Sequence, residues 1–534
     1  MKKLTIAFAA MTCAAMVAAP VAAETLRYAY RADANSLDPY ALNETFTHSF
    51  LGNVYEPLID RDENLKLIPS LATKWEQISP KVWRFTLRKG VKFHDGNDFT
   101  AEDVQFSLKR ALGKGSDVTN KISTVDHAKI VDDHTVDFIM KINNPIFPQE
   151  ITTWFMMDKT WAEKNGATDP SSVKAGIENY ATTNANGTGP FMVESRNQDV
   201  KTVLVPNPKS WRKKTHNLTR VEFTPIKSDP TRVAALLSGK VDMIYPVPLQ
   251  DVARINGTAN VKVLQGPELR TIFMGVDQWR DELLESNVKG KNPFKDIRVR
   301  QAVYQAIDTN AIRDKVMRGA STPSALMVAP GINGHNARLN KRLPYDPAAS
   351  KKLLAEAGYP KGFEVGMDCP NNRYVNDEKI CQAVVSMLAK VGIKVNLLAQ
   401  PKSKYFKKIL SFNTSFYLLG WQPSTYDSLS PLFSVMSTPE RYAKEQEGVL
   451  KGQGAYNPAG YANPELDNLA RKVRNETDPA KRQSLINKAF EIHKKEIGHF
   501  PIHQQALAWG VRDGLKLVQR ADDFFVLRWA RMER

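Results

Sequence analysis

The clearest pattern of hydrophobic and polar positions lies between residues 69 and 110. From residue 82 to residue 87 the side chains alternate, and three hydrophobic ones share a face: Trp83, Phe85 and Leu87. This alternation is typical of a half-buried strand. It resumes at residues 91 and 93 after a turn at Gly90, so the pattern predicts a β-hairpin. Apolar residues at helical spacing follow Thr100, with Asp103 in the first turn, and predict a capped helix.

The second half of the chain alternates helical periodicity with short apolar runs. Val299, Val303 and Ile307 recur at helical spacing. Two further helices, each ended by a glycine and followed by a strand, are expected over residues 346–365 and 377–400. Helices and strands in alternation with short connections favour right-handed crossovers and a largely parallel sheet.

The first 23 residues have the pattern of a secretory signal peptide. Lys2 and Lys3 precede an apolar run, and small residues end the segment, which predicts cleavage after Ala23. The apolar run is short for a membrane-spanning helix. We therefore expect a soluble exported protein.

The 534 residues provide material for two or more hydrophobic cores. The formal charge is 74 − 57 = +17, and removal of Lys2 and Lys3 with the signal leaves 17 − 2 = +15. Basic residues are scattered among acidic ones, and export separates the protein from nucleic acid. The charge therefore predicts no nucleic-acid partner.

Cysteine usage is sparse after the signal segment, with only Cys369 and Cys381. In an oxidising compartment a pair this close favours a disulfide between a strand and the following helix. Two thiols do not complete a tetrahedral metal site, so a metal is the weaker interpretation. The oxidation state of the pair stays open.

The stretch WRFTLRKGVKFHDGNDFTAEDVQFSLKR, in order and spacing, resembles the central motif of the family 5 extracellular solute-binding proteins. These are periplasmic receptors of peptide, opine and nickel ABC importers. GTGPFMVES and NPFKDIRVRQAVYQAID resemble the family as well, and the resemblance runs from Leu26 to beyond Trp509. One departure is the turn at residues 79–81, where Pro80 replaces the usual Asp and Gly.

The resemblance implies an α/β periplasmic binding protein fold, in which two large α/β lobes are joined by a hinge and carry an extra inserted α+β lobe. We expect lobe I to comprise residues 24–55, 180–276 and 500–534, the inserted lobe residues 56–179, and lobe II residues 277–499. Hinge strands are expected near residues 187–191 and 269–275, with a third crossing near residue 500.

Catalytic constellations are missing from the sequence. It contains no G-x-S-x-G elbow, no HExxH helix and no S-x-x-K arrangement with its partners. His493, His499 and His503 cluster near the C-terminus, but their spacing matches no metal motif, and structural histidines are the favoured interpretation. We therefore expect no enzyme activity, no cofactor and no metal site. A secreted hydrolase with a similar cleft remains the alternative.

Two loops match those that line the ligand cleft in the family. In residues 369–377, Arg373 corresponds to an arginine that binds a ligand carboxylate, because a guanidinium forms two charge-assisted hydrogen bonds with that anion. Tyr374 is a candidate wall of the cleft. A surface arginine on a loop held by the disulfide is the alternative.

In residues 418–433, Trp421 is expected to present a flat apolar face to the ligand. Peptide-binding members usually carry an acid three residues later, where this chain has Ser424. Either Asp427 supplies that charge or the ligand lacks a free amine. A core aromatic is the alternative for Trp421, and Tyr245 is a further candidate wall.

The function implied is that of a monomeric periplasmic receptor that closes on a peptide or peptide-like solute and presents it to an ABC permease in the inner membrane. An opine, nickel or haem ligand is a variant within the same class. Ligand identity and length are not encoded in any motif that we recognise.

Overall fold

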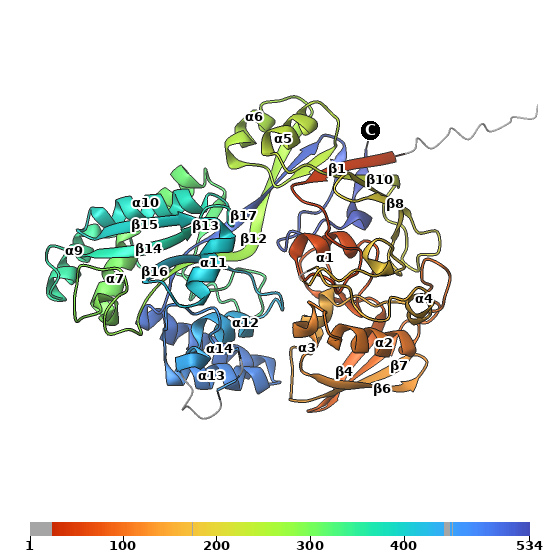
Figure 1. Ribbon diagram of the computed structural model, residues 1–534, viewed down its shortest axis with the longest axis horizontal. Coiled ribbons are helices and arrows are strands. Elements are labelled where there is room, and N and C mark those ends of the chain that lie inside the picture. The colour runs from red at the N-terminus through yellow and green to blue at the C-terminus, as the bar shows by residue number, and fades with distance from the viewer. Residues whose placement is uncertain (1–23, 174, 443–448, 451, 534) are drawn as a thin grey trace, which may run out of the picture.

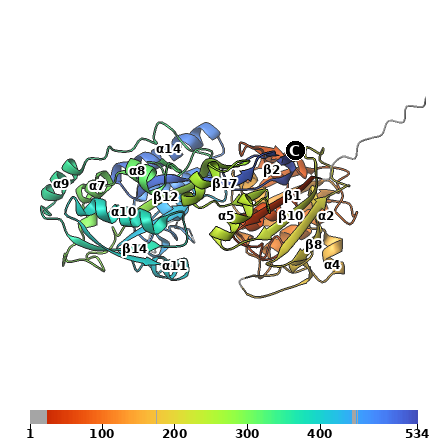
Figure 2. The same ribbon diagram turned by 90° about the horizontal axis from the view of Figure 1, so that it is seen from above.

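The computed structural model describes residues 24–173, 175–442, 449–450 and 452–533. The predicted signal peptide and its cleavage site after Ala23 lie outside the described residues. The molecule has two bodies side by side, and two long strands cross between them, as Figures 1 and 2 show from two directions. These strands are β12 (Val261–Val276) and β17 (Phe500–Arg512).

One mixed sheet runs through both bodies, in the order β15-β14-β16-β12-β17-β11-β1-β10-β9-β8, with β13 paired to β17. We call the body built on β1 and β8–β11 lobe I, and the body built on β14–β16 lobe II. The remaining strands of the sheet are β1 (Glu24–Tyr30), β8 (Phe191–Asn197), β9 (Lys201–Pro206), β10 (Leu218–Pro225), β11 (Met243–Tyr245), β13 (Ser321–Pro323), β14 (Glu364–Pro370), β15 (Lys394–Gln400) and β16 (Phe416–Trp421).

Parallel pairing occurs in one place within each lobe's part of this sheet, and β10, β9 and β8 at the lobe I end are antiparallel. β1 is parallel to β10 and β11, and β14 is parallel to β15 and β16. Around the crossing, β12 is antiparallel to both β16 and β17. The largely parallel sheet expected from the helix–strand alternation therefore occurs only where helices connect the strands, since a strand that returns from the other lobe arrives in the opposite direction.

Helices cover both lobes. In lobe I and its insertion they are α1 (Thr45–Leu51), α2 (Ala101–Leu112), α3 (Phe147–Glu150), α4 (Lys159–Lys164), α5 (Asp229–Leu237) and α6 (Val252–Asn256). In lobe II they are α7 (Ile297–Ala306), α8 (Thr309–Ala311), α9 (Pro347–Glu356), α10 (Asp377–Ala389), α11 (Lys402–Leu410), α12 (Leu429–Pro431), α13 (Pro464–Asn475) and α14 (Pro479–Glu496). The predicted start of α2 is confirmed, because the Asp103 carboxylate accepts a hydrogen bond of 2.8 Å from the Thr100 amide.

A second sheet, in the order β4-β5-β7-β6, forms the insertion, and α2 packs on it (Figure 1). The smaller strands are β2 (Ile59–Arg61), β3 (Leu67–Pro69), β4 (Ala72–Ser79), β5 (Val82–Leu87), β6 (Val125–Asp132), β7 (Thr135–Met140), β18 (Leu515–Lys516) and β19 (Arg531–Met532). The strand predicted at residues 82–87 is present, but its hairpin partner is β4 and not residues 91–93. Residues 91–93 leave the sheet after Gly90 and form a loop instead.

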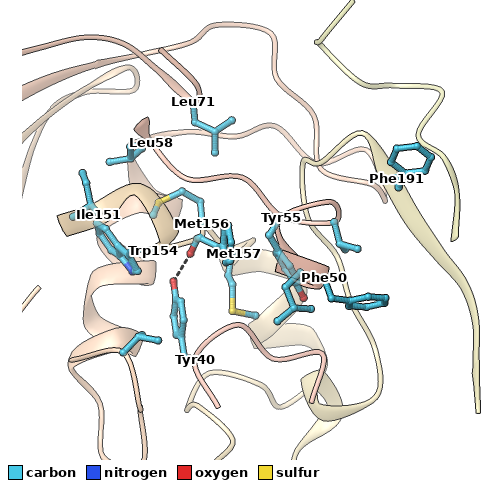
Figure 3. Packing of buried hydrophobic residues seen from close by; sticks show 14 of the residues in the cluster. Tyr40, Phe50, Tyr55, Leu58, Leu71, Ile151, Trp154, Met156, Met157 and Phe191 are labelled. Carbon is cyan, nitrogen blue, oxygen red and sulfur yellow. Dashed lines mark hydrogen bonds between the residues drawn. The ribbon is translucent and has the colours of Figure 1, made fainter. Parts of the chain in front are cut away.

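The insertion does not have a separate core. Its buried side chains belong to the same hydrophobic cluster as those of β1 and α1 in lobe I. Figure 3 shows this junction, where Tyr40 and Tyr55 of lobe I lie beside Trp154, Met156 and Met157. The Tyr40 hydroxyl donates a hydrogen bond of 2.7 Å to the carbonyl of residue 155. Lobe I and the insertion therefore pack as one hydrophobic unit.

An ion pair without solvent exposure also joins the insertion to lobe I. Arg110 of α2 donates to both oxygens of Asp38, at 2.7 and 2.6 Å, and both side chains are 0% exposed. A buried pair of this kind is tolerated because its geometry is bidentate. It sets the position of α2 against the loop that follows β1.

The crossing predicted at residues 187–191 is wrong. This segment packs inside lobe I, where the Gly189 amide donates a hydrogen bond of 2.9 Å to the Val54 carbonyl, and the strand that follows it, β8, is the outermost strand of the lobe I end of the sheet. The glycines of this turn are needed for close approach, because a Cβ at Gly187 would lie 2.1 Å from the Val54 oxygen. In the described part of the chain, two strands, β12 and β17, cross between the lobes and not three.

Replacement of Gly187 by alanine is expected to destabilise the protein by about 3 kcal/mol or more, because two backbone segments must separate to admit the methyl group. Gly90→Ala is the matched control. Gly90 has open space around its Cα but φ is +71°, so we expect about 1–2 kcal/mol from backbone strain alone. Urea unfolding followed by circular dichroism measures both, and equal costs would contradict the close-approach explanation.

Candidate functional site

A cavity of about 300 Å³ lies between the lobes, beside the crossing strands. Its walls come from both lobes and from the crossing itself: Tyr30, Arg31, Asn43, Glu44, Thr45, Pro246, Val247, Leu249, Glu268, Arg270, Arg373, Tyr374, Val375, Gln505, Ala506, Leu507, Ala508, Trp509 and Asp523. Arg31 and Pro246 directly follow the carboxyl ends of β1 and β11, and Arg373 lies three residues after the end of β14. Parallel strands in α/β sheets commonly present their ligand sites at these ends.

A β-bulge in β12 places two charged side chains in this cavity. The register with β17 is regular up to Pro267 and resumes at Thr271, with an irregularity between them. Within the bulge, the Leu269 amide donates to the Ala521 carbonyl at 2.9 Å, and its side chain is buried. Glu268 and Arg270, on either side of Leu269, both line the cavity. The bulge therefore re-aims the strand so that its polar side chains face the cleft.

Glu268 and Arg270 are bonded to each other and to both lobes. The Arg270 Nε donates to Glu268 at 3.1 Å, and its Nη2 donates to the Gln422 side chain at 2.8 Å. The other oxygen of Glu268 accepts a hydrogen bond of 2.7 Å from Gln505 of β17. This network holds the two charges in place at the crossing.

The loop that carries Arg373 is held at several points. The amides of Arg373 and Tyr374 donate to the Asp377 carboxylate at 2.8 and 3.0 Å, and the Val375 amide donates to Gln505 at 3.0 Å. A disulfide joins Cys369 and Cys381, whose Cα atoms are 6.6 Å apart, and ties the end of β14 to α10. The guanidinium is thus carried by a rigid loop at the cavity wall.

Arg373 lies in a cluster of positive charge. Burial lowers the pKa of Arg373, and the neighbouring charges of Arg270 and Arg31 lower it further. Within the described part of the chain, no carboxylate forms an ion pair with its guanidinium, which lies 5.0 Å from the centre of the Tyr374 ring. A carboxylate from a ligand would relieve this repulsion and satisfy the donors.

Tyr374 lies in the loop after β14 and contacts the end of β16, the strand that Trp421 ends. The buried Tyr374 donates to the Gly420 carbonyl at 3.3 Å and also lines the cavity. Trp421 ends β16 half-buried, and its indole donates to the Ser430 hydroxyl at 3.2 Å and lies 4.8 Å from the Tyr456 ring. Trp421 is not among the residues that line the cavity, although its neighbour Gln422 bonds to Arg270, which is.

Ser424 is exposed in the loop that follows Trp421. This loop reaches lobe I, because the Tyr426 hydroxyl donates to Asp522 at 2.9 Å and the Arg61 guanidinium lies 3.9 Å from the centre of the Tyr426 ring. The loop therefore bridges the lobes beside Ser424, which contributes no charge there.

Asp427 does not face the cavity, and the hypothesis that it replaces the missing acid is not supported. Its carboxylate is 0% exposed and accepts hydrogen bonds of 2.8 and 2.7 Å from Arg482 of α14. Asn333 and the Leu429 amide also donate to it. Its position is explained by this pairing with an arginine 55 residues away, which the local sequence could not indicate.

Tyr245 lies behind the cavity and not in its wall. It is buried between the rings of Tyr30 and Trp509, at centre-to-centre distances of 4.7 and 5.2 Å, and burial raises its pKa well above the usual value. Both of these neighbours line the cavity. Tyr245 therefore supports the aromatic wall without reaching the cleft.

The sequence analysis missed the charged residues that line the cavity outside lobe II: Arg31, Glu44, Glu268, Arg270 and Asp523. Asp523 adopts a left-handed conformation (φ 66°), and one carboxylate oxygen accepts a hydrogen bond of 2.9 Å from the Trp509 indole. Burial raises the pKa of Asp523 to about 8, and the charge of Glu268 contributes to the rise. The only local signal was an unusual pair of adjacent acids, Asp522 and Asp523, before an apolar run.

The three C-terminal histidines lie in the interior of lobe II. His493 and His499 are hydrogen-bonded to each other at 2.9 Å, and burial lowers the pKa of His493 and of His503 to about 3. Within residues 24–533, apart from the undescribed gaps, no group of three or more His, Cys, Asp or Glu side chains is placed to hold a metal ion. Over the same residues, no helix is both long and apolar enough to span a bilayer.

Known proteins match this chain along most of its length. The family model for bacterial extracellular solute-binding proteins, family 5 Middle, matches residues 66–443. The glutathione-binding protein GsiB of Pectobacterium atrosepticum is 28% identical over 501 residues, which cover 90% of this chain and 89% of that protein. GsiB of Shigella flexneri is 26% identical over 508 residues, with 92% and 90% covered.

Solved structures share the fold. HbpA2 from Haemophilus parasuis gives a TM-score of 0.81 at 21% identity, covering 96% of this chain and 100% of that one. DppA from Helicobacter pylori, in complex with the peptide STSA, gives 0.73 at 23% identity, covering 96% and 98%. The predicted α/β periplasmic binding protein fold is thereby confirmed.

Asp427→Asn is expected to cost about 3 kcal/mol of unfolding free energy, because it leaves the buried Arg482 without a full counter-charge. Solute affinity should not change, since the residue is outside the cleft. Glu364→Gln is the control, because its ion pair with Lys394 is 39% and 67% exposed and contributes about 0–1 kcal/mol. If Asp427→Asn lost solute binding but kept its stability, the conclusion that Asp427 is outside the binding site would be wrong.

Proposed function

We propose that this chain, which belongs to the bacterial extracellular solute-binding proteins of family 5, captures a small peptide-like solute with at least one free carboxylate in the cleft between its lobes. The observation that carries the proposal is Arg373, whose guanidinium lines the cavity without an ion-pair partner in the described residues and beside two further arginines. Family membership favours a receptor over the alternative of a secreted hydrolase.

The size and charge of the cavity support a short ligand. A volume of about 300 Å³ lies at the lower end of the range for small-molecule sites. Glutathione, which the names of two relatives give as their ligand, is a tripeptide with two carboxylates and one ammonium group. Arg31, Arg270 and Arg373 together provide donors for more than one carboxylate. Glutathione or a similar peptide is therefore the solute class that we propose.

The receptor would work as an exported monomer. Cleavage after Ala23 would release it into the periplasm, and the lobes would close on the solute about β12 and β17 before an ABC permease receives it. Each crossing is a single strand, so bending at the bulge near Leu269 could change the angle between the lobes. N-terminal sequencing of the exported protein tests the cleavage site.

Calorimetry with reduced glutathione and with the dipeptide Met-Leu tests the ligand class, together with native mass spectrometry of solute that co-purifies with the protein. We expect saturable, stoichiometric binding of intact peptide. Hydrolysed products from these incubations would favour the enzyme alternative, and binding of Ni²⁺ or haem without peptide binding would contradict the proposed solute class.

Arg373→Ala is expected to weaken binding of the peptide by about 10- to 100-fold, because it removes a charge-assisted contact of about 1.5–3 kcal/mol. Arg373→Lys should lose less affinity, since lysine keeps the positive charge but cannot form the two parallel hydrogen bonds of a guanidinium. Titration calorimetry measures both variants, with Arg338→Ala as the control, because Arg338 is exposed and is not among the residues that line the cavity. Equal affinities for Arg373→Ala and Arg338→Ala would exclude Arg373 from the binding site.

Small-angle X-ray scattering is expected to show a smaller radius of gyration with saturating glutathione than without it, because closure about the two crossing strands brings the lobes together. Arg373→Ala at the same glutathione concentration serves as the control. An unchanged radius with bound peptide would contradict closure about β12 and β17.

A further inference from the structure

The cleft contains three carboxylates, and two of them have partners that account for their position. Glu44 is the N-cap of α1, and its carboxylate accepts a hydrogen bond of 2.8 Å from the Thr47 amide. Glu268 is paired with Arg270 and accepts from Gln505. The third is Asp523, to which no Lys, Arg or His lies within ion-pair distance among the residues that the structure describes.

The backbone conformation at Asp523 points its side chain away from the protein interior, in which the preceding residue, Asp522, is buried. Asp522 is 0% exposed and accepts a hydrogen bond of 2.9 Å from the Arg520 Nε and another of 2.9 Å from Tyr426. Asp523 then adopts φ 66°, and its amide donates to the Arg520 carbonyl at 3.1 Å. This turn in the chain brings the second carboxylate to the cavity, where the Trp509 indole holds one of its oxygens.

We propose that Asp523, on lobe I, binds the protonated amino group of the solute, and that the receptor therefore selects peptides with a free amine. This inference rests on the proposed peptide-like solute, and it assigns to Asp523 the charge that Ser424 lacks. An ammonium group suits this site, because the carboxylate has a free oxygen, a fixed orientation and no competing protein cation in contact. Arg373 on lobe II would then bind the carboxylate, so that the solute bridges the lobes.

A proton is expected to leave the protein when the solute binds. In the empty cleft, burial and the charges of Glu268 and Asp522 together raise the pKa of Asp523 to about 8, against the hydrogen bond from Trp509 and the charge of Arg31, which lower it. Trp509 of β17 and the tyrosines of β1 and β11, Tyr30 and Tyr245, also lie around this carboxyl. The carboxyl is then mostly protonated at pH 7, whereas an ammonium contact favours its ionised form. Affinity should therefore rise with pH from about 6 to about 8.

Calorimetry on the full protein tests the inference with four probes: glutathione, Met-Leu, and the same two peptides with an acetylated amino group. Asp523→Asn is the informative variant, because asparagine keeps the acceptor for Trp509 and tolerates the left-handed conformation. Asp513→Asn is the matched control, since Asp513 is exposed and lies beyond the end of β17. Titrations at pH 7 in phosphate and in Tris, which differ in ionisation enthalpy, count the protons released.

Asp523→Asn should weaken binding of a free-amine peptide by about 10- to 100-fold, and should change binding of its acetylated form by less than about 2-fold. The unmodified protein and Asp513→Asn should release up to about one proton per free-amine peptide, and Asp523→Asn none. Equal losses for free and acetylated peptides, or unchanged affinity, would overturn the role of Asp523 while leaving the proposed function in place. If none of the four probes binds the unmodified protein, both proposals fail.

Discussion

The antiparallel pairing of β12 with β17 is the interaction on which the rest of the structure depends. These two strands pair from Val261–Arg512 at one end to Met274–Phe500 at the other, and they are part of both halves of the main sheet. Because the ladder passes through both lobes, each lobe's core is built on the same hydrogen-bonded framework. The pairing is irregular at two places, between Pro267 and Thr271 and between Ile272 and Phe273, and residues 268–270 of the first irregularity line the cleft where the lobes meet. Because residues 268–270 are outside the regular pairing, the side chains of Glu268 and Arg270 can face the cleft, while the strand continues into the core of each lobe.

Buried ion pairs hold the loops around this framework. In these pairs each charge has a protein partner of opposite charge, whereas Asp523 and Arg373 in the cleft have none among the described residues. In Asp38–Arg110 and Asp427–Arg482, an arginine donates to both oxygens of a carboxylate, and Asp522–Arg520 is likewise a buried pair. Such geometry offsets the cost of removing the charges from water. The carboxyl of Asp523 and the guanidinium of Arg373 lack this compensation. Their burial shifts their pKa values toward the neutral forms, which a ligand of opposite charge would reverse.

The cleft therefore combines a positive side on lobe II and the crossing with a carboxyl group on lobe I. A zwitterionic solute bound across it would add an electrostatic link between the two bodies. They are also joined by the two crossing strands, by the contact of Tyr426 with Asp522 and Arg61, and by a hydrogen bond of 2.8 Å from the Asn143 side chain to the Asn475 carbonyl. Binding energy would then be available only when the lobes are close enough to touch both ends of the solute. This coupling between binding and lobe position is what a receptor that closes on its ligand requires.

Local patterns in the sequence were sufficient for the elements that local physics determines. The alternation at residues 82–87 and the capping pair at residues 100 and 103 predicted β5 and the start of α2. The loop with Arg373 was identified by its resemblance to a cleft loop of the family and not by a local pattern. Long-range pairing decided the rest. Whether β5 pairs with β4, whether residues 187–191 cross between lobes, and whether Asp427 meets Arg482 or a ligand all depend on segments distant in the chain. Asp523 reaches the cleft only because a left-handed turn separates it from the buried Asp522, and no local pattern of polar residues distinguishes the two.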